Sequence, residues 1–198
     1  MASVQKPEKI NVIPVVDVMP ADLLTPLAVY LKLADKDGDS FLLESVEGGE
    51  TLARYSFLGI DPQFSVTGNE SFYVRREGGQ NTKVNSSVLA FLREHFDRYA
   101  IENDDELPGF TGGAIGTMNF SCSAWFEPKL KESLQPSDDE AAFMFCRTII
   151  AFDHAKQLIK IVTLVFSDEA QGEPERLDQM FEAAKIANGR IREKLENV

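Results

Sequence analysis

The chain contains few cysteines and few histidines, which limits the chemistry that it can support. Of its 198 residues, two are cysteines and two are histidines. Cys122 and Cys146 form no C-x-x-C pair, so the sequence indicates no disulfide framework and favours a reducing compartment. His95 and His154 have no histidine, cysteine or carboxylate at metal-ligand spacing, so we expect structural or surface roles for both.

Basic residues are also scarce, and long apolar runs are missing. The sequence has 20 lysines and arginines against 32 aspartates and glutamates, a formal net charge of -12. An acidic surface repels nucleic acid and anionic membranes, so we expect neither as a partner. No stretch approaches the roughly 20 apolar residues that span a bilayer, and the N-terminal segment MASVQKPEKI lacks the apolar core of a signal peptide. These absences predict a soluble, cytoplasmic chain.

What is present is a set of helical segments separated by runs of strands. Helical periodicity begins after Thr25, which can cap a helix ahead of Pro26, covers about 87–99, and returns from Glu173. The remaining apolar segments are typical of strands. They are SFLLES (40–45), ARYSFLGIDPQFSVTG (53–68, broken at Asp61-Pro62), SFYVRREGGQNTKV (71–84), TGGAIGTMNF (111–120), FMFCRTIIAFD (143–153) and QLIKIVTLVF (157–166).

This order predicts an α+β fold with a largely antiparallel β-sheet and flanking helices, because strict alternation of strands and helices is missing. The length suits one domain over residues 1–198. The segments 143–153 and 157–166 are almost continuously apolar, which predicts two strands buried on both faces.

The polar motifs provide no catalytic constellation. TGGAIG lacks the lysine and Ser/Thr of a phosphate-binding P-loop, so its glycines are interpreted as allowing close backbone packing. The carboxylate pairs Asp104-Asp105 and Asp138-Asp139 lie in polar loops. An acid and base pair needs two carboxylates in contrasting environments, which these loops do not provide. We therefore predict no catalytic residue and no metal ligand in this chain.

The segment FLLESVEGGE (41–50) raises the main functional question. Glu44 and Ser45 directly follow two leucines of a predicted strand, and a double glycine follows them. A carboxylate beside a hydroxyl and free strand-end amides can hold a zwitterion, the carboxylate binding its ammonium group. An exposed glutamate at a strand end is the ordinary alternative.

Five segments occur here in one order: TPLAVYLKL, FLLESVEGGETLARYSFLGIDP, GFTGGAIG, WFEP and FMFCRTIIAFDHAKQLIKIVTLV. Together they resemble the N-terminal region of component I, the large subunit, of anthranilate synthase, from about Pro14 to the final helix. That enzyme is a lyase of tryptophan biosynthesis, which converts chorismate to anthranilate. The resemblance also implies the α+β fold expected above.

The resemblance implies that the strand-end segment bears on L-tryptophan, the feedback inhibitor of that family. The residues that match the family's leucine-glutamate-serine motif are Leu43, Glu44 and Ser45. The neighbouring segment ARYSFLG adds Arg54, Tyr55 and Ser56 as candidates of second rank.

Two departures from the family qualify this interpretation. GTMNFSCSAWFEP stands where the family has a glycine-tyrosine-x-glycine-tyrosine-aspartate pattern, so Thr117–Trp125 indicates a divergent member. The family's magnesium-binding catalytic machinery lies in a C-terminal domain that these residues do not include. The resemblance therefore implies a non-catalytic regulatory domain without a cofactor of its own. Its implied partners are L-tryptophan, a chorismate-binding catalytic domain and a glutamine amidotransferase subunit.

Two alternatives stay open. The chain could be the N-terminal domain of a related chorismate enzyme such as aminodeoxychorismate synthase. It could also be a stand-alone sensor or interaction module that associates with itself, in which case apolar sheet surface should be exposed. We expect that surface on the strands within 143–153 and 157–166.

Overall fold

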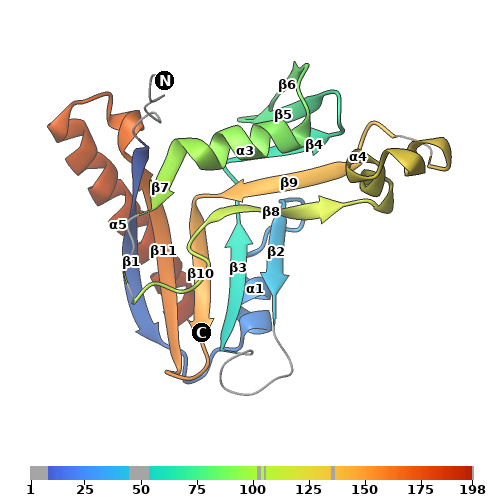
Figure 1. Cartoon of the computed structure of the whole chain (residues 1–198). Helices are drawn as coiled ribbons and strands as arrows, with labels where there is room; N and C mark the ends of the chain where they lie inside the picture. Colours follow the sequence, from blue (N-terminus) through green and yellow to red (C-terminus); the bar gives the residue numbers. More distant parts are fainter. Residues whose placement is uncertain (1–8, 45–53, 102–103, 105, 135–136, 198) are drawn as a thin grey trace.

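The computed structural model describes residues 9–44, 54–101, 104, 106–134 and 137–197, which form two β-sheets flanked by helices (Figure 1). A six-stranded sheet has the order β2-β3-β10-β11-β1-β7, and a five-stranded sheet has the order β6-β5-β4-β9-β8. The strands are β1 (Ile10–Pro20), β2 (Ser40–Leu43), β3 (Tyr55–Ile60), β4 (Phe64–Gly68), β5 (Tyr73–Glu77), β6 (Gln80–Val84), β7 (Tyr99–Ile101), β8 (Gly113–Met118), β9 (Ala141–Cys146), β10 (Thr148–Asp153) and β11 (Leu158–Phe166). All pairs are antiparallel except β1 with β7, so the predicted α+β class is confirmed.

The three predicted helices begin where the sequence predicts, and α4 (Ser123–Phe126) was not predicted. The Thr25 Oγ1 atom accepts a hydrogen bond from the N–H of Ala28, and Ser87 Oγ accepts one from the N–H of Ala90, both at 3.1 Å. Such side-chain caps satisfy N–H groups that lack a partner in the first helical turn. The helices are α1 (Pro26–Leu33), α3 (Val88–Arg98), α4 (Ser123–Phe126) and α5 (Pro174–Glu196), with short 3₁₀ turns at Phe120–Cys122, Pro128–Glu132 and Ser167–Ala170.

The predicted strand 143–153 is wrong as a single element, because it divides at Arg147 into β9 and β10. These two strands belong to different sheets. The neighbouring chain bends alongside, since β3 pairs with β10 and β4 pairs with β9. Asp61, between β3 and β4, has a φ of 48°, and Pro62 follows it without an N–H to donate. One ribbon of paired strands therefore runs through both sheets and bends between them.

Strand β1 was not predicted from the sequence, and its prolines explain why. Proline within a run normally argues against a strand, because it cannot donate to the ladder. Pro14 pairs with Leu164 of β11, whose N–H is donated to Arg147 O on the opposite side. The Pro14 nitrogen thus points away from β11, and β7 pairs only with Ile10–Val12. The missing N–H therefore lies at an unpaired edge.

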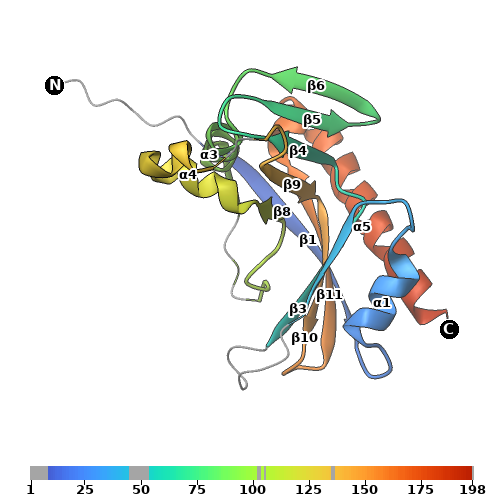
Figure 2. The same ribbon diagram turned by 90° about the vertical axis from the view of Figure 1, so that its right-hand side faces the viewer.

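Helices α1 and α5 cover one face of the six-stranded sheet (Figure 2). Val29 of α1 and Leu195 of α5 pack with Leu58, Ile150 and Ile161 in the main core cluster. On the five-stranded sheet, α3 supplies Val88, Phe91 and Leu92 to a second cluster, which centres on Phe64, Val66 and Phe145.

The other face of the six-stranded sheet is crossed by the segment 106–112, which leads into β8 (Figure 1). The backbone of Gly112 approaches Leu164 so closely that a Cβ there would lie 2.4 Å from Leu164 Cδ1, and Lys160 Nζ donates to Glu106 O. Strands β10 and β11 are consequently buried on both faces, as predicted. The expectation that they expose apolar surface is wrong, because α5 and this segment enclose them.

Exposed apolar side chains of the six-stranded sheet lie instead toward its edges. Val16 and Val18 of β1 are 41% and 43% exposed, and Leu43 of β2 is 49% exposed.

A buried amide in α5 ties the helix to the sheet, and its removal should destabilise the fold. Asn188 is 1% exposed, its Oδ1 accepts from Thr163 Oγ1 at 2.6 Å, and its Nδ2 donates to Val15 O at 3.0 Å. Replacing Asn188 with alanine removes these hydrogen bonds from the buried contact between α5 and the sheet, so we expect a loss of about 1–3 kcal/mol in the free energy of unfolding. Urea denaturation followed by circular dichroism measures it.

Gln179→Ala is the matched control, because Gln179 is an exposed amide on the same helix. Its free energy of unfolding should stay within about 0.5 kcal/mol of the parent value. Equal losses in both variants would contradict the assigned role of Asn188.

Candidate functional site

The ends of β2, β3 and β10 bring most of the predicted site residues together. Leu43 at the end of β2 lies opposite Phe57, and Tyr55 at the start of β3 lies opposite Asp153 at the end of β10. Glu44 follows β2 directly and is exposed. Ser45 lies outside the described residues. We call this group, Leu43, Glu44 and Arg54–Phe57, the strand-end cluster.

Arg54 is held by Asp153 in a two-point ion pair. Its Nη2 donates to Asp153 Oδ2 at 2.8 Å and its Nε donates to Oδ1 at 3.2 Å. Its guanidinium carbon also lies 4.8 Å from the centre of the Tyr55 ring. Asp153 therefore occupies one edge of the guanidinium, and Arg54 fixes the start of β3.

Burial and the Arg54 pair act in opposite directions on the pKa of the Asp153 carboxyl. Burial raises this pKa. Hydrogen bonds from Arg54 and from the Lys156 N–H, together with the guanidinium charge, lower it by a larger amount. The net result is a pKa below its ordinary value. The carboxylate thus stays ionised and keeps Arg54 in place.

Ser56 lies on the opposite face of β3 from Tyr55 and Phe57, because side chains alternate along a strand. It is fully buried, and its Oγ lies 2.8 Å from His154 Nε2. His154 N also donates to Arg54 O at 2.9 Å. This pairing gives His154 the structural role expected of it and directs the Ser56 hydroxyl to a neighbour within the fold.

Leu43, Tyr55 and Phe57 form an apolar wall on the face of the sheet away from the helices. The Tyr55 and Phe57 rings stack with centroids 5.8 Å apart, and Phe110 meets Phe57 edge-on at 5.6 Å. Leu43 lies beside Phe57 in the ladder and is about half exposed. A flat ring can lie on such a wall, and Glu44, the exposed residue that follows Leu43, carries a carboxylate of the kind that accepts an ammonium group.

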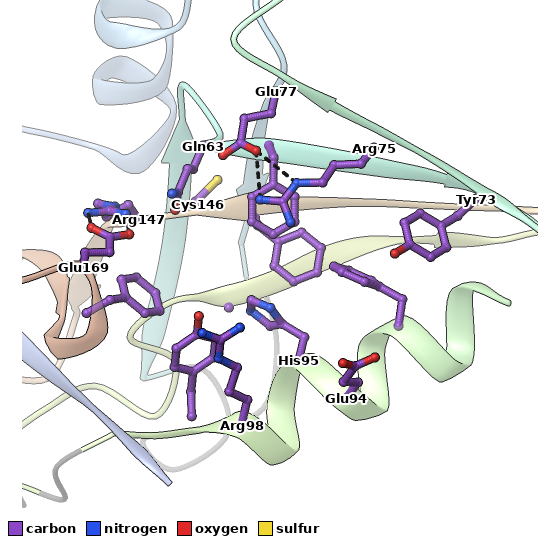
Figure 3. A pocket seen from close by; sticks show the side chains of 16 residues that line it. Gln63, Tyr73, Arg75, Glu77, Glu94, His95, Arg98, Cys146, Arg147 and Glu169 are labelled. Carbon is purple, nitrogen blue, oxygen red and sulfur yellow. Dashed lines mark hydrogen bonds and ion pairs between the residues drawn. The ribbon is translucent and has the colours of Figure 1, made fainter. Parts of the chain in front are cut away.

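A separate pocket lies at the bend between the two sheets, near the start of β10 (Figure 3). Its volume is about 390 Å³, and aromatic rings from β4, α3 and β9 form its walls. The sequence did not predict this pocket, and only a structural or surface role was expected for His95. The one available signal was the spacing of Phe91, His95 and Arg98, which places them on one face of α3.

The described residues hold no group of three or more His, Cys, Asp or Glu that could bind a metal. Both cysteines are buried, and burial together with the charge of Asp61 raises the pKa of the Cys146 thiol to about 11. Cys146 thus packs as a small apolar residue. None of the helices that the structure describes is long and apolar enough to cross a membrane.

Three curated proteins illustrate what the chain is similar to. Probable anthranilate synthase component 1 of Schizosaccharomyces pombe is 34% identical over 191 residues, which are 96% of this chain and 35% of that protein. Anthranilate synthase component 1 of Saccharomyces cerevisiae is 34% identical, with 88% and 33% covered, and that of Synechocystis is 35% identical, with 80% and 31% covered. The chain spans about a third of the length of these relatives.

No protein-family model matches the chain. A crystal structure of anthranilate synthase component I from Streptococcus pneumoniae TIGR4 aligns with 85% of this chain and 36% of its own, at 23% identity and a TM-score of 0.45.

Removing the charge of Asp153 should destabilise the strand-end cluster in a pH-dependent way. We expect Asp153→Asn to lower the free energy of unfolding at pH 7 by about 1–3 kcal/mol, because a buried charge-assisted acceptor is lost. Since the folded pKa lies below the unfolded value of about 3.9, this contribution is present above that value. It is lost as the pH falls through the folded pKa. Urea titrations at pH 7 and at several values below pH 4 measure the difference.

Asp39→Asn is the control, because Asp39 forms an exposed ion pair with Arg76. Such surface pairs contribute about 0–1 kcal/mol. A difference between parent and Asp153→Asn that does not change with pH would show that the ion pair is not its cause.

Proposed function

The chain belongs to the anthranilate synthase component 1 family, whose N-terminal region it matches, and we propose that it is the regulatory domain of such an enzyme. In this proposal it carries part of a feedback site for L-tryptophan and no catalytic residue of its own. The complete protein would convert chorismate to anthranilate in the cytoplasm, with magnesium held by its catalytic domain and a glutamine amidotransferase as its partner subunit.

The observation that carries the proposal is the apolar wall of the strand-end cluster beside an exposed carboxylate. The wall of Leu43, Tyr55 and Phe57 suits a flat, largely apolar ring such as indole. Glu44 directly follows Leu43 of this wall in the sequence and is exposed, and its carboxylate suits the ammonium group of an amino acid. Ser45 is the next residue and would supply a hydroxyl to the polar end of the ligand.

The fold supports a particular division of roles among the candidates. Leu43, Glu44, Ser45 and Tyr55 would contact the ligand. Arg54 is already paired with Asp153, and Ser56 is buried against His154, so both would position the strand that carries Tyr55. The feedback site would therefore have one part that contacts the ligand, at the end of β2 and at Tyr55. A second part, the paired residues of β3 and β10, would support it.

Feedback would operate through a difference in affinity between two arrangements of the enzyme. Tryptophan would favour the arrangement in which the strand-end cluster and the catalytic domain close around it. By linkage, substrate binding to the catalytic domain would then weaken tryptophan binding by the same factor. The relatives described above are all named anthranilate synthase component 1, which favours this proposal over an aminodeoxychorismate synthase domain.

The experiment is a tryptophan inhibition curve on the full-length enzyme that contains this chain. Ser45→Ala and Glu44→Gln should each raise the tryptophan concentration for half inhibition by about tenfold or more, because each removes a polar contact to a charged group. The uninhibited rate should stay near the parent value. Anthranilate fluorescence measures both quantities.

The matched controls are Ser86→Ala and Glu175→Gln, which change the same residue types at other positions along the chain. Their inhibition curves should overlay that of the parent enzyme. The proposal fails if the Glu44 and Ser45 variants keep normal inhibition, or if the parent enzyme is insensitive to tryptophan.

A further inference from the structure

The pocket at the bend lies far from the strand-end cluster and is built from other residues. The two features flank opposite ends of β10, which runs for six residues from Thr148 to Asp153. At about 3.3 Å per residue, this strand separates them by roughly 20 Å. A ligand in the pocket would therefore be independent of tryptophan at the strand-end cluster.

Aromatic rings form the walls of this pocket. Phe64 and Phe145 stack with centroids 4.3 Å apart, and Phe91 meets Phe145 edge-on at 5.7 Å. Tyr73 and Phe166 also line the cavity. The volume of about 390 Å³ falls within the usual range for small-molecule sites, and such walls favour a flat ring.

Two arginines, Arg75 and Arg98, act on the imidazole of His95 within the pocket (Figure 3). His95 packs 4.9 Å from the Phe145 ring centre, and Arg75 and Arg98 are close enough to act on it. Its pKa is lowered, first by burial and then by these two guanidinium charges. A bound anion at this position would relieve that repulsion.

The charged groups around His95 differ in how far they are already paired. Arg75 donates from Nε to Glu77 at 3.1 Å, and Arg147 on the far wall is held by Glu169. Arg98 donates from Nη2 to Asp168 at 2.9 Å. Among the described residues no partner is recorded for its Nε and Nη1 groups. Of the nearby carboxylates, only Glu94 has no recorded partner in that part of the chain, and it is exposed at the rim.

We propose that this pocket binds a small aromatic carboxylate, with its ring against Phe91 and Phe145 and its carboxylate between His95 and Arg98. The ring takes the place of water on the aromatic walls. The carboxylate accepts hydrogen bonds from the Nε and Nη1 groups of Arg98, for which the described residues record no partner. The guanidinium groups of Arg75 and Arg98 would repel a cationic ring, and a neutral ring would offer the Nε and Nη1 groups of Arg98 no charged acceptor.

The probes are benzoate and 2-naphthoate, with benzamide and 2-naphthamide as neutral counterparts of the same shape. Titration of the 198-residue chain should give saturable binding of the carboxylates and at least about tenfold weaker binding of the amides. Histidine side-chain NMR provides a site-specific readout, because the chain has only two histidines. Benzoate should raise the pKa of His95 and leave the His154 resonances unchanged.

Arg98→Gln should weaken carboxylate binding by about tenfold, whereas Arg98→Lys should retain part of it. Arg93→Gln is the matched control, because Arg93 is an exposed arginine on the same helix that does not line the pocket. Circular dichroism confirms that each variant is folded. The proposal is overturned if carboxylates and amides bind equally, if Arg98→Gln binds like the parent, or if no carboxylate binds at millimolar concentration. Displacement of benzoate by L-tryptophan would contradict the independence of the two sites.

Discussion

The bend in the paired strands is the constraint on which the rest of the structure depends. Strands β3 and β4 cross it at Asp61, and β9 and β10 cross it at Arg147. The Arg147 guanidinium donates from Nη1 to Glu169 at 2.9 Å, and its backbone oxygen accepts from Leu164 N. These contacts anchor the bend to β11 and to the 3₁₀ turn that follows it. Because side chains from both sheets converge where the chain turns, the aromatic pocket forms on that side.

The same ribbon also determines where the strand-end cluster lies. Strand β10 begins at the bend and ends at Asp153, whose carboxylate holds Arg54 at the start of β3. Alternation along β3 then directs Tyr55 and Phe57 to one face and Ser56 to the other. Residues that are adjacent in the sequence are thereby divided between an accessible wall and a buried hydrogen bond. This division could not be predicted without knowing which neighbouring strands cover each face.

Local signals were sufficient for much of the fold. The cap at Thr25 and the apolar strand β11 follow from short-range chemistry, and the structure confirms them. Long-range partners were not predictable in this way. Asp153 meets Arg54 from 99 positions away, and Glu106 covers Lys160 from 54 positions away. The chain around Glu106 and Gly112 covers β10 and β11, and no local pattern within those strands predicts this cover.

Strand β1 has a consequence for the order in which the chain folds. It is the earliest strand in the sequence, yet its neighbours are β7 and β11, and β11 begins only at Leu158. At about 5–20 residues per second, a ribosome needs roughly 7–27 seconds to make the chain between β1 and β11. During that time β1 has no long partner, and its prolines at positions 14 and 20 limit pairing with the wrong strand. The six-stranded sheet therefore closes late, when one of its last strands meets its first.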